Sequence, residues 1–155
     1  WAEQRGWRWG GVVVRGSHLI RQWGGTRATI AWSSGEAVLI SIVTGAGEGM
    51  GAGSVLRDLG SVCEVVLSAD ASAAIGICRR TGIGKLRHLD TRILWIQDKV
   101  KSAELVLRKV PGLENPADLM TKHLGAECIA GHLRRLACWP RAGRAGGALE
   151  VAGMF

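Results

Sequence analysis

Three absences in the sequence limit what this protein can be. There is no run of about 18 or more uninterrupted apolar residues, so we expect no membrane span. The first residues, WAEQRGWRWGG, lack a charged leader followed by an apolar block, so we expect no signal peptide. No two of the four cysteines have CxxC spacing, and we expect all of them to be reduced thiols of an intracellular protein: Cys63, Cys78, Cys128 and Cys138.

Aromatic residues and glycine are unevenly used. Tyrosine is absent and Phe occurs once, whereas Trp occurs seven times and Gly 23 times. About 7% glycine is ordinary, so this chain has roughly twice the usual share. The composition indicates a sequence that has drifted. Zinc is only a minor alternative, because Cys128, His132 and Cys138 supply three ligands where structural zinc usually takes four at tight spacing.

Length and charge predict one basic domain. A chain of 155 residues with 47% hydrophobic content can bury one ordinary core, which we assign to residues 1–138. Residues 139–155 lack periodicity and are expected to form a loose tail. The net charge is +7, and residues 79–109 hold nine Lys or Arg against three acids. Such clustering favours contact with nucleic acid, with a solvated helix face as the alternative.

The first half of the chain predicts strands and then a helix. Apolar runs at 12–14, 19–23 and 28–32, separated by turn-like Gly16-Ser17 and Gly24-Gly25, indicate a three-stranded antiparallel meander. Ser33-x-x-Glu36 is typical of a capping box at the start of a helix over 33–59. Five glycines between 45 and 53 weaken this helix, and we expect it to be bent or broken.

The second half alternates strands and helices. A strand over 62–68 leads through Asp70 into a helix over 71–78. An apolar stripe predicts a helix over 87–102, and a strand over 105–110 follows. Asn115 suits an N-cap and Pro116 a first helical position, so a last helix is expected there. This order indicates an α/β or mixed three-layer fold.

Five blocks resemble the ribonuclease H domain that ends the polyprotein of copia-type LTR retrotransposons. They span roughly residues 10–124 in the family's order and read GGVVVRGSHLIRQW, ATIAWSSGEA, SADASAAIG, KLRHLDTRILWIQDKV and NPADLMTKHL. The resemblance implies a five-stranded mixed sheet flanked by helices. It also implies four carboxylates that hold two Mg²⁺ or Mn²⁺ ions for cleaving RNA in RNA–DNA hybrids.

Two family acids have counterparts here. Asp70 in SADAS matches the acid that follows the fourth strand, and Asp118 in NPADLMTK matches the acid that opens the last helix. The resemblance thus implies that both are catalytic metal ligands. From the residues alone, Asp70 could instead be an N-cap, and Asp118 could simply favour the helix dipole.

The other two family acids fail to match. The first lies on the first, central strand, just before a Trp-Ala that resembles Trp1-Ala2, so this acid and most of the strand fall outside the chain. The second is the later Glu of Ser-Ser-x-Glu-Ala-Glu, where this chain has Val38. Glu36 would point about 200° away from Val38 on a helix, and capping explains it better.

The resemblance therefore implies a degenerate, catalytically impaired domain. The alternatives are an active hybrid nuclease completed by an upstream segment, and a nucleic-acid-binding module without catalysis. The expected partners are an RNA–DNA hybrid or other nucleic acid and the rest of a polyprotein, with no membrane. His88, in RHLD, resembles a family position, and local packing is its alternative. The residues expected to contact nucleic acid are Arg79, Arg80, Lys85, Arg87, His88, Arg92 and Lys122.

Overall fold

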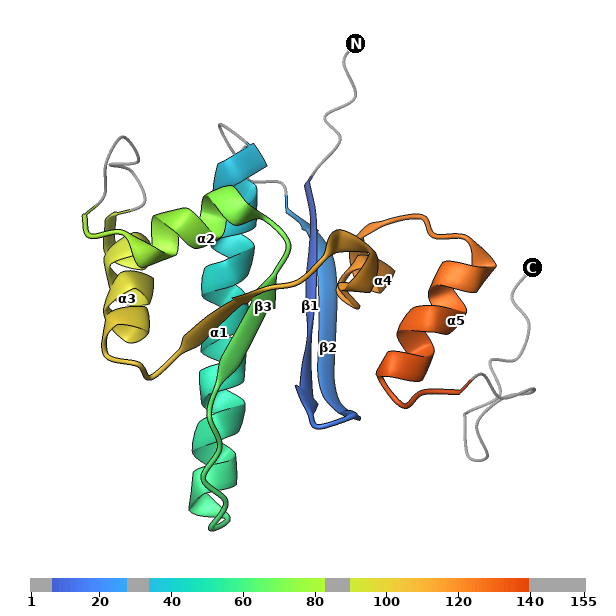
Figure 1. Ribbon diagram of the computed structural model, residues 1–155, viewed down its shortest axis with the longest axis horizontal. Helices are drawn as coiled ribbons and strands as arrows, with labels where there is room; N and C mark the ends of the chain where they lie inside the picture. The colour runs from blue at the N-terminus through green and yellow to red at the C-terminus, as the bar shows by residue number, and fades with distance from the viewer. Residues whose placement is uncertain (1–6, 28–33, 83–89, 140–155) are drawn as a thin grey trace, which may run out of the picture.

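A computed structural model describes residues 7–27, 34–82 and 90–139 of the chain. The fold is mixed α/β, which confirms the broad prediction (Figure 1). In chain order the elements are β1 (Trp7–Arg15), β2 (His18–Arg27), α1 (Ser34–Asp58), β3 (Val66–Ala69), α2 (Ser72–Arg79), α3 (Asp90–Lys101), β4 (Val106–Lys109), the 3-10 turn η2 (Gly112–Glu114), α4 (Asp118–Thr121) and α5 (Ala126–Arg135).

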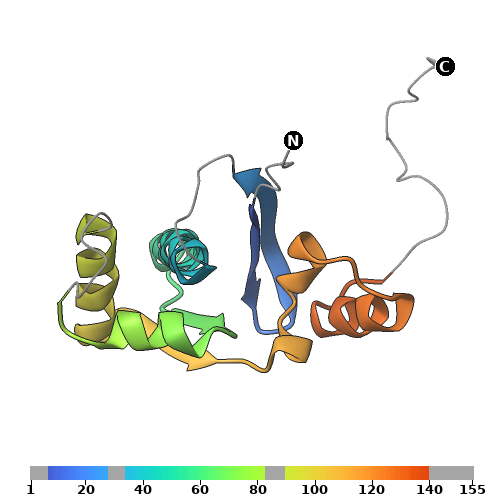
Figure 2. The ribbon, with the colours of Figure 1, turned by 90° about the horizontal axis from the view of Figure 1, so that it is seen from above.

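The described strands form two separate sheets. β1 and β2 make an antiparallel hairpin, with paired residues from Trp7 opposite Arg27 to Arg15 opposite His18. β3 and β4 form a parallel pair. No strand pairing joins the two sheets within the described residues, so the single mixed sheet that we expected is not formed there. The view from above shows the hairpin and the parallel pair on different sides of α1 (Figure 2).

The hairpin confirms two predicted strands and corrects one predicted turn. Strands over 12–14 and 19–23 lie within β1 and β2, and the turn at Gly16-Ser17 is present. Gly24 and Gly25 do not form a turn but lie within β2. A Cβ at Gly24 would lie 3.0 Å from the Cβ of Met120, so the glycine lets α4 lie close to the strand. The predicted strand over 28–32 falls outside the described residues.

α1 is one continuous helix, so the predicted break at its glycines is wrong. Gly45, Gly49 and Gly53 follow one another at a spacing of four residues and therefore share a face of the helix. A Cβ on Gly45 would lie 3.2 Å from Leu67, and a Cβ on Gly49 would lie 3.2 Å from Val65. These glycines let β3 pack closely against α1, and this contact offsets their poor helix propensity. Ser33 and the Glu36 side chain lie outside the described region, so the capping box stays a prediction.

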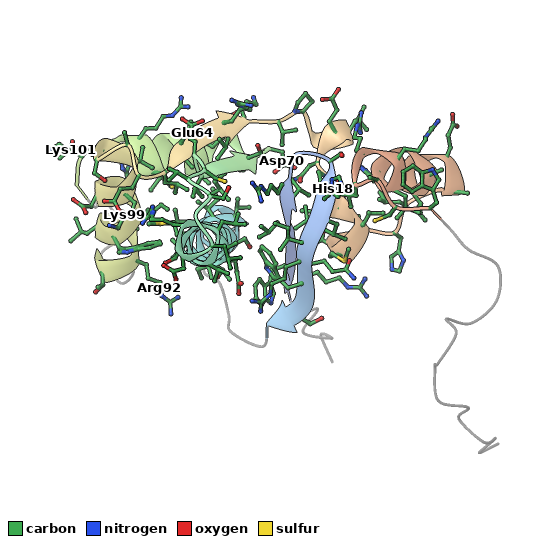
Figure 3. The ribbon with its side chains drawn as sticks, turned by 90° about the horizontal axis from the view of Figure 1, so that it is seen from below. His18, Glu64, Asp70, Arg92, Lys99 and Lys101 are labelled. Atoms are coloured by element: carbon green, nitrogen blue, oxygen red, sulfur yellow. The ribbon has the colours of Figure 1, made fainter. Side chains whose placement is uncertain are left out.

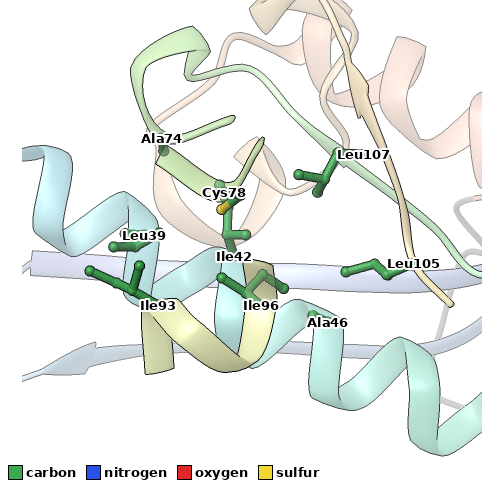
Figure 4. Close-up of a cluster of buried hydrophobic side chains, with 9 residues drawn as sticks. All are labelled: Leu39, Ile42, Ala46, Ala74, Cys78, Ile93, Ile96, Leu105 and Leu107. Atoms are coloured by element: carbon green, nitrogen blue, oxygen red, sulfur yellow. The ribbon is translucent and has the colours of Figure 1, made fainter. Parts of the chain in front are cut away.

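The hydrophobic core lies between α1, α2, α3 and β4 (Figure 4). The predicted stripe of α3 is confirmed at Ile93 and Ile96, which are fully buried. Burial also raises the pKa of the Cys78 thiol to about 11, because the charged thiolate is poorly solvated there. The core side chains are Leu39, Ile42, Ala46, Ala74, Cys78, Ile93, Ile96, Leu105 and Leu107.

The remaining predicted elements are confirmed with shifted ends. β3 begins four residues later than the predicted strand, and α2 and β4 lie within one residue of their predicted bounds. Asn115 does not begin a regular helix: its Oδ1 accepts the backbone N–H of Ala117 at 3.2 Å, and α4 begins at Asp118. α5 was not predicted as a separate helix. Most of the predicted tail, residues 140–155, lies outside the described part.

One stretch of α1 bears on the prediction that no segment spans a membrane. Val38–Asp58 is long and apolar enough to cross a membrane by length and composition alone. The core helices of water-soluble proteins meet the same criterion, and α1 supplies Leu39, Ile42 and Ala46 to the core. The absence of a membrane span therefore stays a prediction.

The glycine face of α1 can be tested by paired substitutions. Gly49→Leu should lower the free energy of unfolding by about 1–3 kcal/mol, because its side chain would collide with Val65. Gly47→Leu is the matched control: nothing lies within 4 Å of a Cβ there, so improved helix propensity should leave stability unchanged or raised by up to about 1 kcal/mol. Urea unfolding measures both changes. Equal effects of the two substitutions would contradict the packing role.

Candidate functional site

The two predicted catalytic acids border one cavity. Asp70 follows the end of β3, and Asp118 is the first residue of α4. Both line a cavity of about 1330 Å³ bordered by β1, β3 and α1, and Val38 lines it from α1. Figure 3 shows Asp70 between the parallel strands and the hairpin. Positions 38, 70 and 118, which are far apart in sequence, thus line one cavity.

Asp118 is held in an ion pair with Lys122. Its carboxylate is buried, with the residue only 7% exposed, and its Oδ2 accepts a hydrogen bond from Lys122 Nζ at 2.9 Å. This bond raises the pKa of Lys122, and the negative charges of Asp118 and Asp70 raise it further. Lys122, which we expected to contact nucleic acid, therefore binds one acid and lies within the field of the other.

Asp70 does not cap the helix that follows it. Ala71 occupies the N-cap position of α2, and no side-chain hydrogen bond caps this helix. The alternative role of Asp70 as an N-cap is therefore wrong. The carboxylate is half-buried at the cavity wall, and its Oδ2 lies 3.7 Å from where a Cβ on Gly112 would be. A glycine in η2 leaves room beside this acid.

The donor set around the cavity does not fit two divalent ions. Such a centre needs several hard oxygen ligands at one point, whereas the predicted site offers only Asp70 and Asp118, and Asp118 is paired with an ammonium group. Glu64 also lines the cavity, but it precedes β3 whereas Asp70 follows that strand. At the helix position where the resemblance implies a further acid, Val38 supplies only methyl groups. Across the residues that the structure describes, no three His, Cys, Asp or Glu side chains gather into a possible metal site.

The zinc alternative also fails within that region. Cys128 is exposed on α5, and the Cys138 thiol donates to the Leu136 carbonyl at 3.4 Å. His132 is 2% exposed, and its Nδ1 is buried without a hydrogen-bond partner. These three side chains are not gathered as metal ligands.

The predicted nucleic-acid contacts are spread over several elements. Arg79 is exposed at the end of α2, where its Nη2 donates to the Leu107 carbonyl at 2.8 Å. Arg80 follows it and Arg92 lies on α3, both of them exposed. In Figure 3, Arg92 lies beside α3 with Lys99 and Lys101, well away from Asp70. Three further predicted contacts lie outside the described residues: Lys85, Arg87 and His88.

One cation of the basic segment has a clear local role. Lys99 Nζ lies 2.8 Å from Glu104 Oε2, and Ser102 Oγ donates to Glu104 Oε1 at 2.9 Å. The hydrogen bond from Lys99 to Glu104 raises the pKa of Lys99. This exposed network ties the end of α3 to the start of β4, as the alternative of a solvated helix face predicts for part of the segment.

Sequence reasoning missed His123 at the cavity wall. Its place directly after Lys122, within the block NPADLMTKHL, was the available signal.

Comparisons with protein-family models, with curated proteins and with solved structures find no match to this chain. The resemblance to ribonuclease H domains therefore depends on the quoted blocks and on the grouping of Val38, Asp70 and Asp118.

The electrostatic coupling at the cavity predicts a ranked response of Lys122. Asp118→Asn should lower the pKa of Lys122 substantially, because it removes both the hydrogen bond to the carboxylate and its charge. Asp70→Asn should lower it less, because only a more distant charge is lost. NMR titration of the lysine side chains measures both shifts. A larger shift from Asp70→Asn would show that the pairing is wrong.

Proposed function

We propose that this chain is a degenerate ribonuclease H-like domain of copia-type retrotransposon descent that binds nucleic acid without cleaving it. One observation carries the proposal: the three positions at which the family resemblance expects acids, now Val38, Asp70 and Asp118, line one cavity. They come from α1, from the end of β3 and from α4. Their grouping supports common descent more strongly than any single sequence block does.

The side chains at these positions argue against hydrolysis. Two-metal hydrolysis needs ligands that hold an attacking water and the leaving oxygen between two ions. Val38 cannot bind a cation, and Lys122 places a positive charge on Asp118, where an ion would have to lie. Asp70, for which no ion pair is seen among the described residues, would by itself hold Mg²⁺ or Mn²⁺ weakly. The domain therefore keeps the layout of a nuclease and lacks its chemistry.

Charge supports a retained affinity for nucleic acid. The chain carries a net charge of +7, and phosphate contacts by Lys and Arg are the main source of affinity that does not depend on sequence. Arg80 and Arg92 are exposed on the side of the molecule formed by α2 and α3. We place the nucleic-acid surface there, away from the Asp118–Lys122 pair.

A cleavage assay tests the loss of catalysis. The unmodified chain should give no Mg²⁺-dependent cleavage of an RNA–DNA hybrid above background, because only Asp70 and Asp118 supply carboxylates at the metal-binding positions that the resemblance implies. Val38→Glu and Asp70→Asn are assayed alongside. Cleavage by the unmodified chain that Asp70→Asn abolishes would overturn the proposal and favour the alternative of an active hybrid nuclease.

A binding assay tests the nucleic-acid surface. Fluorescence anisotropy should show binding of a hybrid that weakens steeply with salt, and Arg92→Gln should reduce the slope of log K against log salt by about 0.9 if one phosphate contact is lost. Arg134→Gln on α5 is the matched control, because it removes the same charge at the opposite end of the molecule. Equal effects would contradict a surface on α2 and α3. No binding at low salt would remove the nucleic-acid role.

A further inference from the structure

A buried glutamine joins the end of α2 to α3. Gln97 lies on α3, directly after the core residue Ile96, and its side chain is buried. Its Nε2 donates to the Ile77 carbonyl at 2.9 Å and to the Gly82 carbonyl at 3.0 Å. Its Oε1 accepts the N–H of Gly82 at 3.1 Å. We call these bonds the Gln97 clamp, and Figure 1 shows that α2 ends beside α3, the two helices that the clamp connects.

The Gln97 clamp binds backbone groups at the end of α2 and in the turn that follows. Ile77 belongs to the last turn of α2, where carbonyls have no partner N–H within the helix. Gly82 has a φ of 88°, a left-handed conformation that favours glycine and turns the chain away from the helix. A carboxamide has both donors and an acceptor, so one side chain holds the helix end and the turn together.

Arg80 lies between the two clamped points. It is the C-cap residue of α2. Ile77 precedes it and Gly82 follows it, and both are bound to Gln97. The backbone at Arg80 is therefore fixed relative to α3, which also carries Arg92.

Other contacts keep the two helices together without the Gln97 clamp. Ala74 and Cys78 of α2 pack in the same core cluster as Ile93 and Ile96 of α3. The clamp acts on the end of α2 and on the turn, where the core cluster has no members. Loss of the clamp should therefore loosen the position of this corner while the helices stay packed.

A fixed distance between two cations matters for binding a polyanion. Phosphates follow one another at regular intervals along a nucleic-acid strand, so cations that are already in place can contact them with a smaller loss of conformational entropy. Arg80 and Arg92 are both exposed on the surface formed by α2 and α3. The Gln97 clamp connects the two elements that carry them.

We propose that Gln97 is a positioning residue for nucleic-acid binding: it holds Arg80 at the end of α2 in a fixed place relative to Arg92 on α3, so that both contact phosphates of one bound hybrid. This inference rests on the proposed function, because it concerns how that surface is arranged. Gln97 is uncharged and buried, so it acts through the arginines and not by contact with the hybrid.

A substitution without any change in charge tests this role. Gln97→Met keeps a side chain of similar size and removes the hydrogen bonds of the clamp. In anisotropy titrations with an RNA–DNA hybrid, it should weaken binding about fivefold and lower the slope of log K against log salt by about 0.9, because one phosphate contact is lost. In an Arg80→Gln background, Gln97→Met should weaken binding no further, because that contact is already absent.

Ile96→Val is the control for stability. It removes a core methyl group between the same two helices and leaves every hydrogen bond of the clamp in place. It should lower the free energy of unfolding without changing the hybrid affinity. If the unmodified chain binds the hybrid and Gln97→Met leaves affinity and slope unchanged, or if Ile96→Val weakens binding equally, the positioning role alone is overturned. No binding by the unmodified chain would overturn the proposed function as well.

Hydrogen exchange of the unmodified chain decides the question if Gln97→Met does not fold. A hybrid that binds the clamped form more tightly must stabilise the clamp by the same factor. Saturating hybrid should therefore slow exchange of the Gly82 amide, which donates to Gln97, by about fivefold. The Leu136 amide, which donates to the His132 carbonyl at the end of α5, is the control and should change less. Equal or no slowing at Gly82 would show that Gln97 does not position this surface.

Discussion

The close approach of β3 to α1 is the contact on which the rest of the structure depends. Gly45 and Gly49 leave no side chain between the helix and the strand, so Leu67 and Val65 pack against the helix itself. This contact fixes where β3 ends, and so places Asp70 at the cavity that Val38 lines. The packing of the parallel pair and the position of the candidate site both follow from this glycine face.

The chemistry of the cavity is governed by how its charges are satisfied. A buried carboxylate needs a compensating charge or hydrogen bonds, and Lys122 supplies both to Asp118 from one turn along the chain. A metal ion could play the same role, but only with more oxygen ligands than this wall offers. Val38 makes the helix side of the cavity apolar, which favours packing over ion binding. The site is therefore stable as a salt bridge and poor as a metal centre.

The sequence predicted elements wherever local periodicity and tertiary packing agree. The stripe through Ile93 and Ile96 predicted α3. The blocks around Asp70 and Asp118 predicted two acids of one site, and the structure shows that both line one cavity. The sequence failed where packing overrides propensity: Gly49 reads as a helix breaker until its contact with Val65 is known. Gly24 suggests a turn for the same reason. The close contact that requires a glycine there is with Met120, which is far away in sequence. The separation of the strands into two sheets could not be predicted from side-chain patterns, because strands pair through backbone N–H and C=O groups.

Stability around β3 comes from packing on α1 more than from the edge of the strand. In a parallel pair alternate residues bond to the neighbouring strand, so the backbone groups of Val66 and Ser68 do not bond to β4. Hydrogen bonds at these groups would add little, because each protein hydrogen bond adds only about 0.5–1.5 kcal/mol net. The larger gain is the removal of apolar surface on α1 and β3 from water, at roughly 25 cal/mol per Å². The glycines of α1 increase this gain, because they let Leu67 lie against the helix backbone.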